Sequence, residues 1–208
     1  MLKLKYNRFH LGVVLLVGIL LLLTGCTTVQ TKNTGTGDQP AKSTTTTTLN
    51  PATIAAAQKA LKFYEIISLD QTRAQLEAQL GVPGEVQADG RVAYFDPESG
   101  YGVMIEYGED DTVFAKRLIP NAKSPELAAL NPVPVTDKQT YRLAAGMPYY
   151  EVQDIMGGDG IEISLSKPEP GSPKQVYGLG WFNPDGSLAI VYLNLPKGEV
   201  ISSEYIPG

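Results

Sequence analysis

The chain contains very little of the chemistry on which most hydrolases and metal proteins depend. Its 208 residues include one cysteine, one histidine and one tryptophan, and both His10 and Cys26 lie near the start. A single thiol excludes an intramolecular disulfide framework and a cysteine-based zinc cluster. Ser-His and Cys-His catalysis is excluded from the rest of the chain. No spacing marks out a glycosidase-like carboxylate pair among the 22 acidic residues. We therefore expect no enzyme, no cofactor and no metal site.

Basic charge is also scarce. The sequence has 17 lysines and arginines against 22 acidic residues, for a net charge of -5. Nucleic-acid binding needs a basic surface that displaces phosphate counterions, so this balance argues against it. The length is sufficient for one or two modest domains.

The apolar run near the start is too short to span a membrane. Lys3, Lys5 and Arg8 precede residues 11–23, which are apolar apart from two glycines. A spanning helix needs roughly 20 apolar residues, whereas this run suits a signal peptide. It ends in Leu23-Thr24-Gly25-Cys26, which resembles a bacterial lipobox. We therefore expect residues 1–25 to be a lipoprotein signal peptide. A plain secretory signal and an uncleaved anchor are the alternatives.

The resemblance to a lipobox implies that Cys26 is acylated, with palmitate or a similar chain, and binds the protein to a membrane. Two or more acyl chains are sufficient for stable anchoring. We expect residues 26–50 to be a disordered tether, because they hold ten threonines and few apolar residues. The folded part is then expected outside the cytoplasm, on the cell membrane or the outer membrane.

Residues 51–120 show two helical segments followed by short strands. Asn50 is a capping residue and Pro51 suits the first position of a helix, so we expect the folded part to begin there. The spacing of apolar residues predicts helices over 52–69 and 71–80, with Asp70 as the cap of the second. Short runs separated by turn residues predict strands over 85–88, 91–95, 102–107 and 112–119.

Residues 136–208 repeat this pattern after a proline-bearing linker over 121–135. The aromatic segment at 94–97 matches 181–184, the strand at 103–107 matches 188–192, and 118–120 matches 205–207. The sequence therefore predicts an α+β fold of two tandem units. Each unit would consist of two helices and a four-stranded antiparallel meander.

The segment 143–157 carries Gly146-Met147-Pro148 at the start of a helix and Gly157 at its end. It resembles the helix signature of small envelope domains related to the beta-lactamase inhibitory protein, including assembly lipoproteins of the SmpA/OmlA (BamE) type. The first unit departs from that signature, with Asp70, Gln71 and Thr72 where glycine, methionine and proline would be expected. In the tandem form of this family, the sheets grip a partner protein. The resemblance thus implies binding through the sheets, by an inhibitor-like or adaptor module.

The aromatic residues supply candidate contacts for such a partner. Tyrosine and tryptophan are favoured at interfaces, but on strands they more often pack in a core. We select Tyr101, Tyr149, Tyr150 and Trp181 as candidate partner-binding residues, with Trp181 equally suited to the core. Tyr107 and Tyr192 are expected in the core. Two alternative functions remain: a structural role in an envelope complex, and binding of a small ligand or cell-wall fragment.

Overall fold

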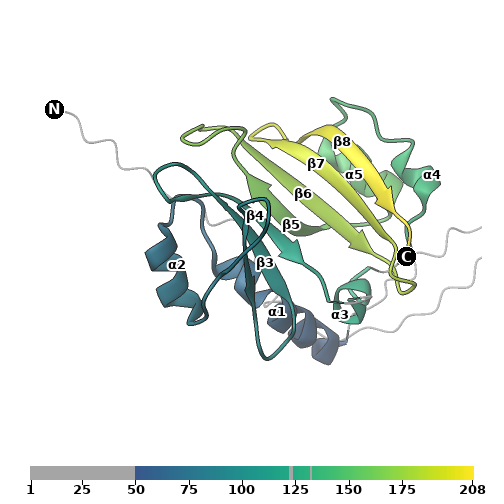
Figure 1. The fold of residues 1–208 in the computed structure, drawn as a ribbon. Coiled ribbons are helices and arrows are strands. Elements are labelled where there is room, and N and C mark those ends of the chain that lie inside the picture. Colours follow the sequence, from purple (N-terminus) through teal and green to yellow (C-terminus); the bar gives the residue numbers. More distant parts are fainter. Residues whose placement is uncertain (1–49, 122–123, 132) are drawn as a thin grey trace, which may run out of the picture. The chain divides into compact units, whose positions relative to one another are not determined.

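The computed structural model describes residues 50–121, 124–131 and 133–208, which contain five helices and eight strands (Figure 1). The predicted signal peptide, the lipidation site at Cys26 and almost all of the tether lie outside the described residues.

The first two helices begin at capping residues that the sequence supplies. Helix α1 (Pro51–Ile66) starts after Asn50, whose side-chain oxygen accepts a hydrogen bond of 3.0 Å from the Ala52 N–H. Helix α2 (Arg73–Leu80) starts at Thr72 in a reciprocal capping box with Gln75. The predicted cap at Asp70 is wrong: this residue has φ 69°, and the helix begins three residues later.

Strands β1 (Glu85–Val86), β2 (Val92–Phe95), β3 (Gly102–Tyr107) and β4 (Val113–Ile119) follow α2. After them come helices α3 (Pro125–Ala128), α4 (Asp137–Thr140) and α5 (Tyr149–Met156). Strands β5 (Ile161–Ser166), β6 (Gln175–Phe182), β7 (Leu188–Leu195) and β8 (Glu199–Ile206) complete the order. Gly157 follows α5 in the left-handed region with φ 82°, which confirms the predicted end of the helix at that residue.

The predicted fold class of two tandem helix-helix-sheet units is wrong. The eight strands form a single antiparallel sheet in the order β1 to β8, and most of the helices are short. Strand β4 joins β5 edge to edge, and three residue pairs carry this junction, with Lys116 opposite Leu165 at its centre. The backbone groups at the outer edge of β4 are thereby paired, instead of ending a separate sheet.

The stretch expected as a linker also contributes to the core. In α3, Leu127 is fully buried and Ala128 is 4% exposed. Both belong to the same apolar cluster as residues of α1, β2 and β3. The side chains of a four-residue helix therefore fill space behind the sheet, so this stretch does more than connect the elements around it.

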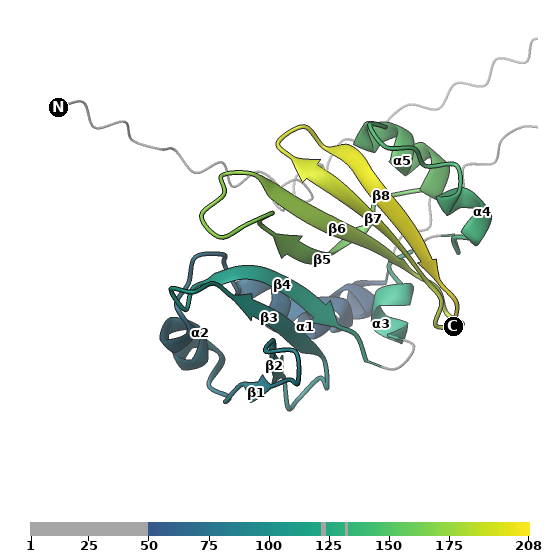
Figure 2. The same cartoon turned by 45° about the horizontal axis from the view of Figure 1, so that its top comes forward.

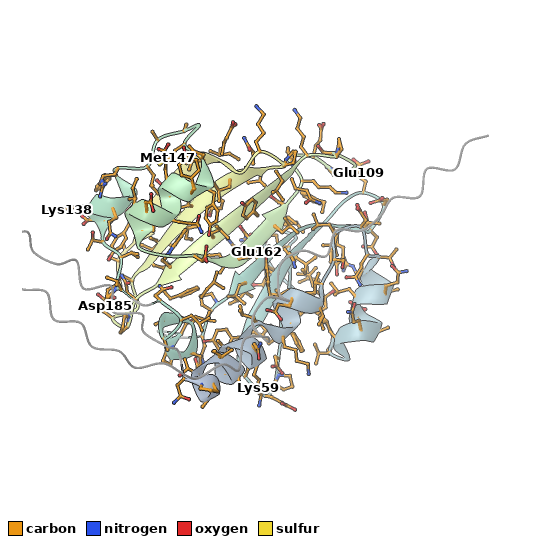
Figure 3. The ribbon with its side chains drawn as sticks, turned by 180° about the vertical axis from the view of Figure 1, so that it is seen from behind. Lys59, Glu109, Lys138, Met147, Glu162 and Asp185 are labelled. Carbon is orange, nitrogen blue, oxygen red and sulfur yellow. The ribbon has the colours of Figure 1, made fainter. Side chains whose placement is uncertain are left out.

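Helices α1 and α5 lie on the same face of the sheet. Lys116 contacts α1. The residues paired with it across the neighbouring strands share its face, and they run from Leu165 through Tyr177 to Leu193. Leu193 packs in the apolar cluster that also contains residues of α5. Figure 2 shows α1 against β3 and β4 and α5 alongside β8, and Figure 3, from behind, shows both helices in front of the strands. The opposite side bears Met104, Arg117, Ser164 and Tyr192, which are partly or fully exposed, whereas Phe182 and Ile190 at its end pack in the apolar cluster that contains residues of α1 and α3. We call this side the open face.

Candidate functional site

The open face presents a continuous row of side chains across the sheet. Because strand side chains alternate between faces, residues paired across neighbouring strands share a face. The row through Arg117 consists of Ala93, Met104, Arg117, Ser164, Gly178, Tyr192 and Ser202. It joins one charged, three polar and two apolar side chains, with a glycine between Ser164 and Tyr192. Such a mixed surface differs from the apolar side that the helices cover.

An apolar hollow of about 260 Å³ opens on this face where β4 separates from β5. These two strands stay paired only up to Arg117, so the following residues of β4 diverge and leave a gap. The walls and floor of the hollow are mostly apolar, and Arg117 and Glu204 are its charged members. The apolar lining residues are Leu118, Pro120, Ile163, Phe182, Leu188, Ile190 and Ile206.

A cluster of three polar side chains from three strands stands beside the hollow. The guanidinium of Arg117 donates a hydrogen bond to the Tyr192 hydroxyl, which in turn donates to Glu204 over 2.9 Å. Arg117 and Glu204 form an ion pair at 4.0 Å, and both side chains are about half exposed. Burial, together with the hydrogen bond to Glu204, raises the pKa of Tyr192. The phenol therefore stays protonated and hydrogen-bonds both the arginine and the glutamate.

Gly178 makes room for this cluster. A Cβ at that position would lie 2.4 Å from the Ser164 Oγ and 3.1 Å from the ring of Tyr192. A side chain there would therefore displace the tyrosine ring, and with it the hydroxyl that orients Arg117.

A second, more polar hollow of about 160 Å³ adjoins the first. Arg117 and Tyr192 line it as well, together with Ser164 and Ser166. Arg91 is also in the lining, where its Nε donates to Asp89 over 2.8 Å. The two hollows thus meet at Arg117, with an apolar space on one side and hydroxyl groups on the other.

On the helix side, the buried Lys116 has a structural role. Its Nζ donates to the main-chain oxygens of Tyr64 and Ile67, each over 2.9 Å, and lies 4.0 Å from the centre of the Tyr64 ring. Burial lowers the pKa of Lys116 and raises that of Tyr64, whose hydroxyl donates to Glu162 over 2.9 Å. Figure 3 shows Glu162 in the region between α1 and α5. This lysine satisfies carbonyl groups at the end of α1, which otherwise lack partners.

Two of the predicted partner-binding residues lie in the core. Tyr101 is 2% exposed and its hydroxyl donates to Glu126 over 2.8 Å. Trp181 is 1% exposed and its indole N–H donates to the Gly158 carbonyl over 3.2 Å. Their selection as contact residues was wrong, because strand pairing and helix packing cover both rings and leave no surface for a partner.

Tyr149 and Tyr150 begin α5 on the helix side of the sheet. Tyr149 is half-buried and its hydroxyl donates to Asp159 over 2.9 Å. Tyr150 is 64% exposed and its hydroxyl donates to Glu151. Of the four selected residues, Tyr150 is therefore the most exposed, and neither tyrosine lines the two hollows of the open face.

Sequence reasoning missed the residues that meet on the open face. Arg117 and Tyr192 are 75 positions apart, and no motif connects them. Tyr192 was expected in the core because it alternates with Ile190. Both residues lie on one face: Ile190 is 3% exposed, and Tyr192 is partly buried against the same apolar cluster, so its ring packs as expected. The contact of its hydroxyl with Arg117 was not expected.

Within the described residues, no cluster of three or more histidine, cysteine, aspartate and glutamate side chains could hold a metal ion. Helices long and apolar enough to cross a bilayer are likewise absent from the part of the chain that the structure describes. No protein-family model matches this chain, and no curated protein matches it at a significant level.

Proposed function

We propose that this chain is a lipid-anchored protein of the bacterial envelope that binds a partner protein through the open face and catalyses no reaction. The observation that carries the proposal is an apolar hollow on the open face of the sheet, beside the half-exposed Arg117 and Glu204. Stable protein interfaces need an apolar centre with a polar rim. The hollow and the Arg117 cluster supply these two parts.

Sequence features support the anchoring part of the proposal. The basic start, the short apolar run and the segment Leu23-Thr24-Gly25-Cys26 follow one another in the order of a lipoprotein signal. The threonine-rich stretch that follows would hold the folded part away from the lipid surface. Growth with an alkyne-tagged palmitate analogue should label the wild-type chain and leave a Cys26→Ala variant unlabelled. Equal labelling of the two chains would contradict anchoring at Cys26.

The resemblance of residues 143–157 to the beta-lactamase inhibitory protein-like and BamE-like domains supports protein binding through that helix segment alone, because the tandem fold that it implied is not the fold of this chain. We extend it to the manner of binding and not to inhibition of a beta-lactamase, because the matched residues are structural. Glycines and apolar residues of a helix determine how the helix ends and packs, whereas the choice of partner depends on the residues that touch it.

A crosslinking pull-down from native envelopes tests the proposal, with residues 50–208 as bait. One dominant protein at near-equal stoichiometry is the expected result. If a control lipoprotein captures its own partner and this bait enriches nothing, protein binding is rejected. A structural role would instead appear as loss of envelope integrity on deletion, without a discrete partner.

The polar hollow favours a second candidate, the binding of a small ligand or cell-wall fragment. Its serine hydroxyls and Arg117 could hydrogen-bond a sugar or a short peptide. A rise in melting temperature with purified muropeptides, combined with an empty pull-down, would favour this alternative over protein binding.

A further inference from the structure

The size of the apolar hollow limits what it can hold. Its volume of about 260 Å³ exceeds the roughly 150 Å³ of a cavity that accepts benzene. It falls just below the range of roughly 300–1,000 Å³ typical of pockets for drug-sized molecules. One aromatic or branched aliphatic side chain suits this space. A single buried side chain of that kind is the usual anchor of a protein interface.

The packing beneath the hollow keeps it apolar and closed at the bottom. A Cβ at Gly180 would lie 2.9 Å from the Ile163 Cδ1 and 3.2 Å from the Phe182 ring. The glycine thus allows these two side chains to come together and form the floor. Ile190 is 3% exposed, whereas Ile206 is 44% exposed, so the hollow has a buried wall and an accessible apolar rim.

Arg117 adds a charge requirement at the edge of the hollow. A guanidinium has five N–H donors. Among the described residues, the side chain of Arg117 donates a hydrogen bond to the Tyr192 hydroxyl. Glu204 lies 4.0 Å away, too far for a hydrogen bond, and half of the arginine side chain is exposed. The partner that best matches a planar, partly exposed guanidinium is a carboxylate.

We propose that the hollow receives one apolar side chain of the partner protein, while a carboxylate of the same partner segment binds Arg117. This inference rests on the proposed function, because it names the feature that the partner inserts. Glu204 then acts as a competitor: it neutralises Arg117 in the free protein and must yield part of that interaction when the segment binds. Tyr192 keeps the guanidinium at the edge of the hollow in both states.

The test measures binding of N-acetylphenylalanine, which carries an apolar ring and a carboxylate. The full chain, purified from membranes in a mild non-ionic detergent, is labelled at its isoleucine methyl groups for NMR. Ile163, Ile190 and Ile206 report on the hollow, and Ile54, Ile67 and Ile201 serve as internal controls. We expect concentration-dependent shifts of the first three signals at millimolar probe. N-Acetylphenylalaninamide, without the carboxylate, and N-acetylglycine, without the ring, should each bind more weakly.

Variants separate the two parts of the site. Arg117→Met should lower the affinity for N-acetylphenylalanine by roughly three- to tenfold and leave the affinity for its amide unchanged. Glu204→Gln should raise the affinity for N-acetylphenylalanine by a similar factor. Ile206→Trp, at the accessible rim, should block both probes. Arg142→Met changes an exposed arginine outside both hollows and should have no effect. Equal binding of acid and amide, or shifts confined to the control isoleucines, would overturn the proposal.

A pull-down with the variants distinguishes this inference from the proposed function. If wild type captures a partner and the Arg117→Met, Ile206→Trp double variant loses it, protein binding and the anchor pocket are both supported. A partner retained by the double variant overturns the anchor pocket and leaves protein binding intact. If wild type captures nothing, protein binding fails, and the anchor for a partner fails with it. Unshifted Ile67 signals in every variant show that the fold is preserved.

Discussion

Replacing Asn183 by alanine should destabilise the fold more than any exposed substitution nearby. Asn183 is 4% exposed at the turn after β6. Its amide group donates to the Val135 carbonyl over 2.7 Å and to the Ser187 Oγ over 2.8 Å, and its oxygen accepts from the Val135 N–H over 2.9 Å. One side chain thus satisfies both main-chain groups of a buried residue that lies 48 positions earlier in the sequence.

The size of the effect follows from those two main-chain groups. Each buried group left without a partner costs about 1–3 kcal/mol, so the Asn183→Ala variant should lose about 2–6 kcal/mol of unfolding free energy. That loss is a large fraction of a typical total of about 5–15 kcal/mol. The Ser187 hydroxyl keeps its hydrogen bond to Asp185 and adds little to the loss.

Urea unfolding followed by fluorescence measures this loss directly. Trp181 is the only tryptophan of the chain and is 1% exposed, so its emission reports the folded state. Asn194→Ala is the matched control, because the Asn194 oxygen accepts one N–H, that of Glu199, in a more accessible hairpin. The control should lose about 0.5–1.5 kcal/mol. An Asn183→Ala loss no larger than that of the control would refute the reasoning.

Three further outcomes follow from buried groups. Burial raises the pKa of Tyr101 to about 12, so its stabilising effect is complete below the unfolded value of 10 and is lost between pH 10 and about 12. The loss at pH 11 is about 1.4 kcal/mol, and a Tyr101→Phe variant should show a shallower decline in unfolding free energy between pH 9 and 11. An unchanged slope would contradict this. Lys116→Ala should lower the free energy of unfolding by about 1–3 kcal/mol, because two carbonyls lose their donor. An unchanged melting temperature would count against the role of Lys116 at the end of α1. Gly178→Val should lower the free energy of unfolding by about 1–3 kcal/mol, because the new side chain clashes with Ser164 and Tyr192. A variant as stable as the wild type would show that the tyrosine ring does not need this glycine.

Local sequence patterns specified many of the elements but not how the sheet is joined. Asn50-Pro51 and Gly157 predicted the start of α1 and the end of α5 because capping depends on residues close in sequence. The junction of β4 and β5 depends on pairing between residues about 50 positions apart, such as Ala115 and Ser166. Alternation along each strand is the same whether a strand edge is free or paired. The sequence therefore could not distinguish two sheets from one.

The candidate site was harder to predict for a related reason. Tyr101 and Trp181 were selected by residue type, yet their rings are buried by helices and loops whose packing the sequence does not specify. The hollow depends on where β4 separates from β5, and its polar cluster joins β4, β7 and β8. Period-two alternation places Tyr192 and Ile190 on one face, but only the positions of the helices determine which face stays open.

Site-specific photo-crosslinking in native envelopes tests the central claim most directly. A photoreactive residue at Met104 lies on the open face, and one at the exposed Lys62 of α1 lies on the helix side. If the open face binds a partner protein, position 104 should yield one dominant crosslinked protein and position 62 should not. Absence of a crosslinked protein at position 104, or equal yields at the two positions, would contradict the claim.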